Sequence, residues 1–288
     1  MRQKVKIAHL ILVHHLPHQV LRLVNSIQHP GADIFIHVDA KSDLKPFEEI
    51  FKIKNVYCID NRTKVYWGTY SIIEATLRSF ETVLKQNTDY SYINLLSGSD
   101  YPLKPIEEFH SFLETHPGKA FFYYKDILKD WPNGIDRTKK YFLADYMRKG
   151  SFKIAAFINL FLPARKVPHN FKLLGHSQWF TITPQHARYL IDYIASHPEV
   201  KRYFRLSFAP DEFMFPTILY SSPLKNTIVN DNLRYIDWSE NKNNPKTLTT
   251  HDAAQLLKSG KFFARKFDTQ QNTTILDYLD KYILRKRD

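Results

Sequence analysis

The chain has 288 residues, of which 43% are hydrophobic and 24% charged, as is typical of a globular protein with one large or two small domains. Its net charge of +12 favours an anionic partner such as nucleic acid, a phosphate ester or a membrane surface, and its single cysteine, Cys58, excludes an intramolecular disulfide. No apolar run is long enough to span a bilayer and no cleavable signal is visible, so we expect a protein of the reducing cytoplasm.

The N-terminal segment predicts the beginning of an α/β sheet. Residues 5–13 form an apolar run without a helical stripe, residues 19–28 have helical spacing, and residues 33–38 form a second apolar run. Such a strand–helix–strand unit predicts a mostly parallel sheet with a nucleotide site at the strand ends, where Asp39 stands. Spacing alone equally allows Asp39 to cap the next helix. Neither a G-x-G-x-x-G fingerprint nor a P-loop occurs, which counts against a dinucleotide dehydrogenase and a Walker ATPase.

Two loops further along have the composition of ligand-binding loops. Trp67 precedes a glycine and a predicted helix at about 70–85, and it either offers a platform for a flat ring or belongs to the core. A predicted strand at 90–96 ends in the small, polar loop 97–104, which contains a single aspartate, Asp100. A metal-dependent sugar-nucleotide enzyme normally has a D-x-D pair in such a loop, because Mg²⁺ and Mn²⁺ prefer clustered oxygen ligands. The loop has no such pair, and no Cys/His cluster suits zinc.

The segment 137–172 differs in composition from the rest of the chain. It follows a predicted helix at 106–113 and a short aromatic strand at 119–124, and it contains nine basic residues and one acid, Asp145. Within it, residues 152–162 are apolar, too short to span a bilayer but suited to an interfacial segment. A basic, solvent-facing surface over a small core cluster would give the same pattern.

Two acids, Asp211 and Glu212, stand in an otherwise apolar and aromatic run between Pro210 and Pro216. Pro210 suits the first turn of a helix and Pro216 is expected to interrupt it, so both carboxylates are predicted at a helix N-terminus. Apolar surroundings raise the pKa of a carboxyl group, which suits a general base. The alternative is that the two acids only interact favourably with the helix dipole and have no catalytic role.

The other elements predicted for the C-terminal half are two strands and three helices. The strands are expected at 175–183 and 230–238, and the helices at 184–196, up to about 258 with Thr250 as a cap, and at the basic C-terminus.

Seven blocks of the chain, in order, resemble the core-2/I-branching β-1,6-N-acetylglucosaminyltransferases, a family that includes the peptide O-xylosyltransferases. The blocks are H-V-D-A-K-S (37–42), V-Y-W-G-T-Y-S (65–71), I-N-L-L-S-G-S-D-Y-P-L-K (93–104), G-H-S-Q-W-F (175–180), A-P-D-E-F (209–213), L-R-Y-I-D-W (233–238) and F-A-R-K-F-D (263–268). The resemblance implies one Rossmann-like glycosyltransferase A (GT-A) domain over 1–288. Its nucleotide-binding half would be about 1–124, and its acceptor-side and diphosphate-binding half about 125–288. Segment 125–172 matches poorly, so we expect acceptor binding to differ there.

The resemblance also implies an activity and a set of site residues. The activity is the transfer of a sugar from a UDP-sugar to a glycan hydroxyl with inversion, without a metal or a cofactor. The sugar that the resemblance favours is GlcNAc. Glu212 resembles the catalytic base, and Lys246 stands nearest to a second diphosphate-binding arginine of the relatives. The donor contacts expected are Leu12, Val13, Asp39, Trp67, Ser99, Asp100, Lys246, Arg265 and Lys266, and the acceptor contacts are Arg137, Trp179, Asp211 and Trp238.

This chemistry agrees with the residue types. Single-displacement inversion needs one carboxylate to take the acceptor proton, and a UDP that leaves without Mg²⁺ needs fixed Lys and Arg side chains at its diphosphate. The donor remains open, with UDP-xylose or UDP-galactose as alternatives. A non-catalytic glycan-binding or nucleic-acid-binding protein is the other class, but no RNP motif, zinc finger or helix-turn-helix is recognisable, so we expect no nucleic-acid partner.

We expect the protein to differ from the animal relatives in having no membrane anchor, and its sequence contains one cysteine where they have many. It therefore resembles a bacterial, cytoplasmic form that acts on a surface-polysaccharide or lipid-linked acceptor. We expect peripheral contact with the inner face of an anionic membrane through the basic segment 137–172 and residues 285–287.

Overall fold

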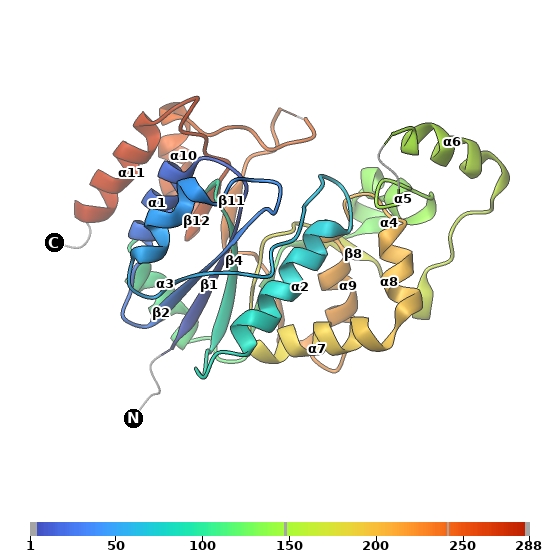
Figure 1. The fold of residues 1–288 in the computed structure, drawn as a ribbon, viewed down its shortest axis with the longest axis horizontal. Helices are drawn as coiled ribbons and strands as arrows, with labels where there is room; N and C mark the ends of the chain where they lie inside the picture. The colour runs from blue at the N-terminus through green and yellow to red at the C-terminus, as the bar shows by residue number, and fades with distance from the viewer. Residues whose placement is uncertain (1–4, 147–148, 241, 286–288) are drawn as a thin grey trace.

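The computed structural model describes residues 5–146, 149–240 and 242–285, and a seven-stranded sheet forms its centre (Figure 1). The strand order is β10-β6-β9-β4-β1-β2-β3. Strand β1 is parallel to β2 and β4, β2 is parallel to β3 and β10 to β6, while β9 is antiparallel to its neighbours β4 and β6. The strands are β1 (Ile7–Val13), β2 (Ala32–Val38), β3 (Val56–Cys58), β4 (Tyr92–Ser97), β6 (Ala120–Phe122), β9 (Thr181–Ile182) and β10 (Ile228–Asn230). The α/β class with a mostly parallel sheet is therefore confirmed.

Two smaller sheets flank the central one. Strands β11 (Arg234–Ile236), β12 (Phe263–Arg265) and β5 (Asp100–Pro102) form the first, and β7 (Tyr124–Asp126) pairs with β8 (Leu174–His176) in the second. Because β9 and β10 come from beyond residue 124, the two predicted halves of the chain share one central sheet.

The central strands are apolar throughout because the sheet is covered on both faces. All seven residues of β1 are buried, and successive residues point alternately to two hydrophobic cores. One core packs the sheet against α1 (Pro17–Ser26), α3 (Ile106–Glu114), α10 (Ala253–Lys258) and α11 (Thr274–Arg285). The other packs it against α2 (Ser71–Leu84), α7 (Pro184–Ser196), α8 (Pro198–Arg205) and α9 (Met214–Tyr220). Figure 1 shows the two groups of helices on opposite sides of the sheet.

Three short helices belong to the segment that resembles no family block. These are α4 (Ile127–Asp130), α5 (Pro132–Lys139) and α6 (Ser151–Phe161). Single 3₁₀ segments occur at Lys45–Lys52, Pro168–Asn170, Pro210–Glu212, Lys225–Thr227 and Thr250–Asp252. No helix of the described ranges is long and apolar enough to cross a membrane.

Two predicted strands are each divided in the structure. The strand expected at 175–183 is β8 and β9 with a break between them, and the strand expected at 230–238 is β10 and β11, which lie in different sheets. Arg234 stabilises both breaks: its buried guanidinium donates to the carbonyls of Leu95 (2.9 Å) and Phe180 (3.0 Å) and to that of Asn232. The Phe180 carbonyl also accepts from the Leu95 N–H (3.0 Å), so the guanidinium adds to the backbone ladder at the break.

Two local predictions were wrong in detail. Pro216 does not end a helix, because α9 begins at Met214 and Pro216 falls in its first turn, where a missing N–H costs no intrahelical bond. The cap of the 3₁₀ turn that leads into α10 is Thr249 and not Thr250: the Thr249 backbone N–H and hydroxyl both donate to Asp252 Oδ2, as in a capping box.

Candidate active site

The described residues enclose a cleft of about 1100 Å³ at the carboxyl ends of the parallel strands. The backbone N–H of Asp39 donates to the Val13 carbonyl (2.8 Å), and that of Gly98 donates to the Leu12 carbonyl (3.1 Å). The loops after β1, β2 and β4 therefore leave the sheet side by side. This is the edge where a parallel sheet places its ligand, as the sequence predicted.

Asp39 organises the loop after β2 and also lines the cleft. Its Oδ1 accepts from the backbone N–H groups of Lys41 (2.8 Å) and Val65 (3.3 Å), and the Lys41 ammonium lies 3.4 Å from Oδ2. The alternative that Asp39 caps the next helix is wrong, because Leu44 is the N-cap of that helix. Trp67 also lines the cleft and is 64% exposed as a residue, so the alternative that it belongs to the core is also wrong.

The loop after β4 divides its polar residues between the cleft and the layer beneath it. Ser97 and Ser99 line the cleft, whereas the fully buried Asp100 does not. Asp100 Oδ2 accepts from the Ser97 N–H (3.0 Å) and Oδ1 accepts from the Ser97 hydroxyl (2.9 Å), and Nε of Arg265 lies 3.0 Å from Oδ1. Asp100 was predicted to contact the donor, but it lies outside the cleft, where it supports Ser97 and Arg265.

Asp211 and Glu212 lie in a single 3₁₀ turn, Pro210–Glu212, before α9. The turn is bonded to the Trp67 loop, since the N–H of Ala209 donates to the Gly68 carbonyl (2.9 Å). From the other side Gly175 of β8 approaches it closely: a Cβ at Gly175 would lie 2.7 Å from the Glu212 carbonyl oxygen. The acids are therefore held between two glycine-containing segments that belong to different family blocks.

Arg137 of α5 is the direct partner of Glu212. Its Nη1 donates to Glu212 Oε2, and both side chains are about a fifth exposed, at 22% and 23%. The guanidinium is fixed in turn by the rings of Trp131 (4.9 Å) and Phe208 (5.5 Å). Glu212 Oε1 accepts no hydrogen bond from the described residues, so one oxygen of the carboxylate is left to the cleft.

Burial and the nearby positive charges act in opposite directions on the pKa values of the two carboxyl groups. Burial raises the pKa of both, and at Asp211 the negative charge of Glu212 adds to the rise. The charge and hydrogen bond of Arg137 work against the rise in the pKa of Glu212. The direct hydrogen bond from Arg137 therefore favours the ionised form of Glu212, against the burial that raises its pKa.

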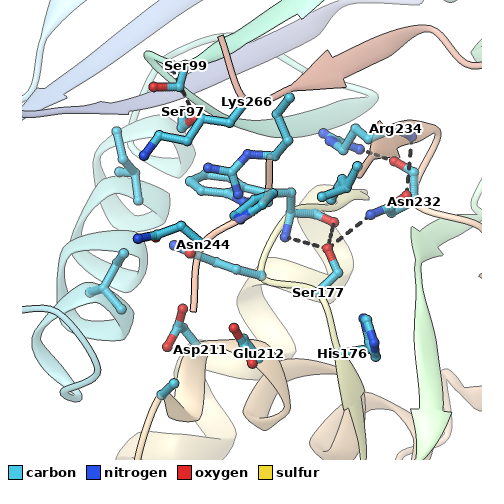
Figure 2. A pocket seen from close by; sticks show the side chains of 18 of the residues that line it. Ser97, Ser99, His176, Ser177, Asp211, Glu212, Asn232, Arg234, Asn244 and Lys266 are labelled. Carbon is cyan, nitrogen blue, oxygen red and sulfur yellow. Dashed lines mark hydrogen bonds between the residues drawn. The ribbon is translucent and has the colours of Figure 1, made fainter. Parts of the chain in front are cut away.

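The predicted cations occupy three different environments. Lys266 lines the cleft and makes no ion pair with any residue of the described ranges, and Figure 2 shows it across the cleft from Asp211 and Glu212. Arg265 also lines the cleft, but its charge is shared with Asp100 and its guanidinium lies 4.4 Å from the ring centre of Trp179. Lys246 does not line the cleft: its ammonium is 2.6 Å from Asp252 Oδ1, in the capped turn before α10.

Aromatic rings form the wall opposite the strand ends. Trp238 and Trp131 approach His176 with ring centres 6.4 and 5.3 Å away, and all three line the cleft. Burial, aided by the charges of Lys125 and Arg137, lowers the pKa of His176 to about 4, so its imidazole is neutral at physiological pH. Trp179, which was expected at the acceptor, also lines the cleft, and its ring centre lies 4.4 Å from the Arg265 guanidinium.

The family described as "Core-2/I-Branching enzyme" matches residues 7–258, which is most of the chain. The chain belongs to the core-2/I-branching enzyme family. Curated relatives include Xylosyltransferase 2 of Rattus norvegicus, 26% identical over 311 residues, and Xylosyltransferase oxt of Drosophila pseudoobscura pseudoobscura, 25% identical over 316. These alignments cover 97% and 98% of this chain but only 34% of each relative, so the chain spans about a third of their length.

A solved structure of apo mouse xyloside xylosyltransferase 1 aligns over 90% of this branching-enzyme chain and 97% of its own, with a TM-score of 0.42 and 8% identity.

The cleft of this branching-enzyme family member brings together all but two of the residues predicted from its sequence. Asp100 and Lys246 are outside it. Those inside are Leu12, Val13, Asp39, Trp67, Ser99, Arg137, Trp179, Asp211, Glu212, Trp238, Arg265 and Lys266.

The sequence reasoning missed several polar groups of the cleft. His14 and His15 directly follow β1 with their rings stacked 4.0 Å apart, and the rule for strand ends that selected Asp39 would have found them. Ser177 and Asn232 are bonded to each other at 3.0 Å (Figure 2). They lie in the two strand breaks, which no periodicity indicates.

A possible metal-ligand group was also missed. His169, His197 and Glu199 bring one ligand atom each within 4.8 Å of one another. None of these three residues lines the cleft. His169 Nε2 is 2.8 Å from Glu199 Oε1, the distance of an ordinary hydrogen bond between exposed side chains.

Proposed function

We propose that this chain transfers a sugar from a UDP-sugar to a glycan hydroxyl with inversion at the anomeric carbon, and that Glu212 is the general base. The observation that carries the proposal is the placement of Glu212 and Lys266 in one cleft, at the edge of a parallel sheet where nucleotides bind. A cleft of about 1100 Å³ offers room for a nucleotide-sugar and part of an acceptor.

In the proposed step Glu212 Oε1 takes the proton of the acceptor hydroxyl. The acceptor oxygen attacks the anomeric carbon from one face, and the bond from that carbon to the UDP oxygen breaks on the other, so UDP leaves with the electron pair. Arg137 keeps Glu212 ionised before the step, and its hold on Oε2 directs Oε1 to the substrate. Burial keeps the carboxylate basic enough to accept the proton.

The donor is proposed to lie along the strand ends. Leu12, Val13 and Trp67 supply apolar and ring contacts for the uracil, and Asp39 supplies a carboxylate for the uridine. Lys266, which no described carboxylate neutralises, stabilises the charge that develops on the leaving diphosphate. Arg265 adds to this field, although Asp100 offsets part of its charge. We infer from these fixed cations that transfer needs no divalent metal.

The acceptor is proposed to enter along the aromatic wall formed by Trp131, His176 and Trp238. Flat rings beside a neutral imidazole suit the apolar faces and hydroxyl groups of a sugar. GlcNAc is the donor sugar that we expect first. The xylosyltransferase relatives make UDP-xylose the main alternative, and UDP-galactose remains a third. The bacterial, cytoplasmic setting remains a prediction from the sequence.

The test is a panel of UDP-GlcNAc, UDP-xylose and UDP-galactose incubated with the protein and simple glycan acceptors, with UDP release and glycan product both measured. We expect one donor to be preferred. Glu212→Gln should lower its turnover by about 10²–10⁴-fold, because the variant keeps the shape and loses the base. Glu81→Gln, an exposed acid on α2, is the matched control and should leave turnover unchanged. Equal turnover in Glu212→Gln and the parent protein would refute the role of Glu212.

A further inference from the structure

Helix α6 exposes large apolar side chains around most of its circumference. Its sequence, SFKIAAFINLF, contains three polar residues only. Phe152, Phe157, Leu160 and Phe161 are 62%, 63%, 78% and 72% exposed, and Ile154 and Leu162 are exposed as well. Monomeric soluble proteins rarely leave so many neighbouring large apolar side chains in water, so this surface requires a partner.

The polarity of α6 is inverted relative to a helix that packs on a core. The residues buried against the body of the protein are the small Ser151 and Ala155. The amide of Asn159 also faces inward, where it accepts from the Tyr141 N–H (2.8 Å) and donates to the Tyr141 carbonyl (2.9 Å). An ordinary surface helix does the reverse, with its apolar stripe inward and its polar residues in water.

The chain that follows α6 is firmly anchored, so the helix is not a loosely attached segment. The buried Arg165 donates through Nη1 to the carbonyls of Lys140 (3.0 Å) and Leu206 (2.8 Å), and its backbone N–H donates to the Lys139 carbonyl (2.9 Å). Figure 1 shows α6 at the edge of the molecule, at the end opposite α11. The protein thus presents an apolar helix outward on a fixed base.

Basic residues stand on α6 and on both sides of it in the sequence. Four exposed lysines, Lys139, Lys149, Lys153 and Lys166, lie on α6 or close to it in sequence, and none makes an ion pair with a described residue. The acids of the same region are neutralised, because Asp136 pairs with Lys140 at 2.6 Å and Asp145 pairs with Arg205 at 2.5 Å. The net field around α6 is therefore positive.

We propose that α6 is an interfacial helix that docks the protein on an anionic lipid bilayer. Its phenylalanine and leucine side chains would enter the boundary between headgroups and acyl chains, and the four lysines would contact the anionic headgroups. An apolar surface around most of a single helix fits a fluid, shapeless partner such as a bilayer, whereas a protein groove covers one stripe of a helix. The helix has 11 residues and is too short to span the bilayer.

Docking through α6 would also hold the candidate active site close to the membrane surface. Helix α5, which comes just before α6 in the chain, carries Arg137 to Glu212, so the membrane-facing segment and one wall of the cleft belong to one stretch of sequence. If the proposed transfer is correct, its acceptor is a saccharide presented at the membrane surface. This last step rests on the proposed function, while the docking of α6 does not.

The experiment is sedimentation of the whole protein with vesicles of phosphatidylcholine alone and of phosphatidylcholine mixed with phosphatidylglycerol. The double variant Phe157→Ser, Phe161→Ser removes the apolar contact, and Lys149→Glu, Lys153→Glu reverses the charge. The matched controls are Tyr57→Ser, Tyr278→Ser, which removes exposed rings elsewhere, and Lys54→Glu, Lys85→Glu, which reverses exposed lysines elsewhere. Thermal unfolding and UDP binding check that each variant is folded.

We expect the parent protein to bind the anionic vesicles and to bind the neutral ones far less. Both α6 variants should lower the partition coefficient by about tenfold or more, and both controls should not. Equal sedimentation of the parent with and without anionic vesicles would overturn the proposal, as would unchanged binding of the α6 variants. A parent protein that is dimeric in solution and becomes monomeric in the phenylalanine variant would assign α6 to a second copy of the chain instead. Release of UDP from the UDP-sugar is measured separately, so a failure of docking and a failure of the transferase proposal can be told apart.

Discussion

The two walls of the cleft are built in different ways. The wall along which we propose that the donor binds, called the donor wall below, consists of strand ends. Their loops are fixed by backbone hydrogen bonds, such as those from Asp39 and Gly98 to the carbonyls at the end of β1. The opposite wall depends on side chains: the Arg137–Glu212 pair and the rings around His176. A parallel sheet therefore fixes the first wall through its topology, whereas the second wall can change with single substitutions. This difference suits a fixed nucleotide and a variable acceptor.

The largest effect is expected from a pair of lysine variants that test the donor wall. Lys266→Ala should lower kcat by about 10²–10³-fold, because it removes a fixed charge at the leaving diphosphate. Lys246→Ala should leave kcat within about threefold of the parent value, because that ammonium is bonded to Asp252 outside the cleft. Steady-state kinetics with the preferred donor measure both. Equal losses in the two variants would contradict the placement of Lys266 at the diphosphate.

Gly175, which packs against the acidic turn 210–212, offers a test of the position of that turn. In Gly175→Ala the added Cβ would lie 2.3 Å from the Phe213 Cβ and 2.7 Å from the Glu212 carbonyl, so the acidic turn must move. We expect a loss of about 1–3 kcal/mol in the free energy of unfolding and at least about a tenfold loss of kcat. In Gly118→Ala the Cβ meets no atom within 4 Å but is strained by the φ of +73°. This variant therefore controls for a loss of stability away from the cleft, and its kcat should stay at the parent value. A parent-like kcat for Gly175→Ala would show that the position of the acidic turn is not critical.

The pH profile of kcat/KM tests the opposite wall, which is built from side chains. Arg137 lowers the pKa of Glu212, so Arg137→Gln should raise that pKa further. Since the base acts only when ionised, the acidic limb of the kcat/KM profile should move to higher pH. Lys139→Gln, on the same helix but exposed, should leave the limb in place. A limb that stays, or moves to lower pH, in Arg137→Gln would remove Glu212 as the titrating base.

The smallest effect is expected at the capped turn behind the donor wall. Thr249→Ala removes the hydroxyl of the capping box with Asp252 and should cost about 1 kcal/mol in the free energy of unfolding. Because the turn lies outside the cleft, kcat should not change. Denaturant unfolding and kinetics on the same sample check this, and a large loss of kcat would extend the donor wall to this turn.

Much of the donor wall was predictable because its signals are local. Continuous apolar runs at β1 and β2 predict buried parallel strands, and the rule for strand ends then selects Asp39. The same rule selected Asp100 incorrectly. That carboxylate is drawn under the cleft by Arg265, a residue from β12 whose approach no local pattern of the loop reveals.

The rest of the site depends on contacts between distant segments. The breaks that place Ser177 and Asn232 in the cleft are stabilised by Arg234 through carbonyls of β4 and of the chain before β9. Lys246 was selected for its position near the other basic residues, but the acid of a capping box six positions further on binds it. Sequence spacing carries no information about either partner.

The most direct test of the central claim is the binding of UDP to metal-free protein. With EDTA present, isothermal calorimetry should give the same affinity for UDP as in the presence of added Mn²⁺, and Lys266→Ala should weaken it by about tenfold or more while Glu212→Gln does not. These results would show that a fixed cation holds the diphosphate and that Glu212 serves a different step. UDP binding that disappears in EDTA and returns with Mn²⁺, or that is indifferent to Lys266→Ala, would contradict the account.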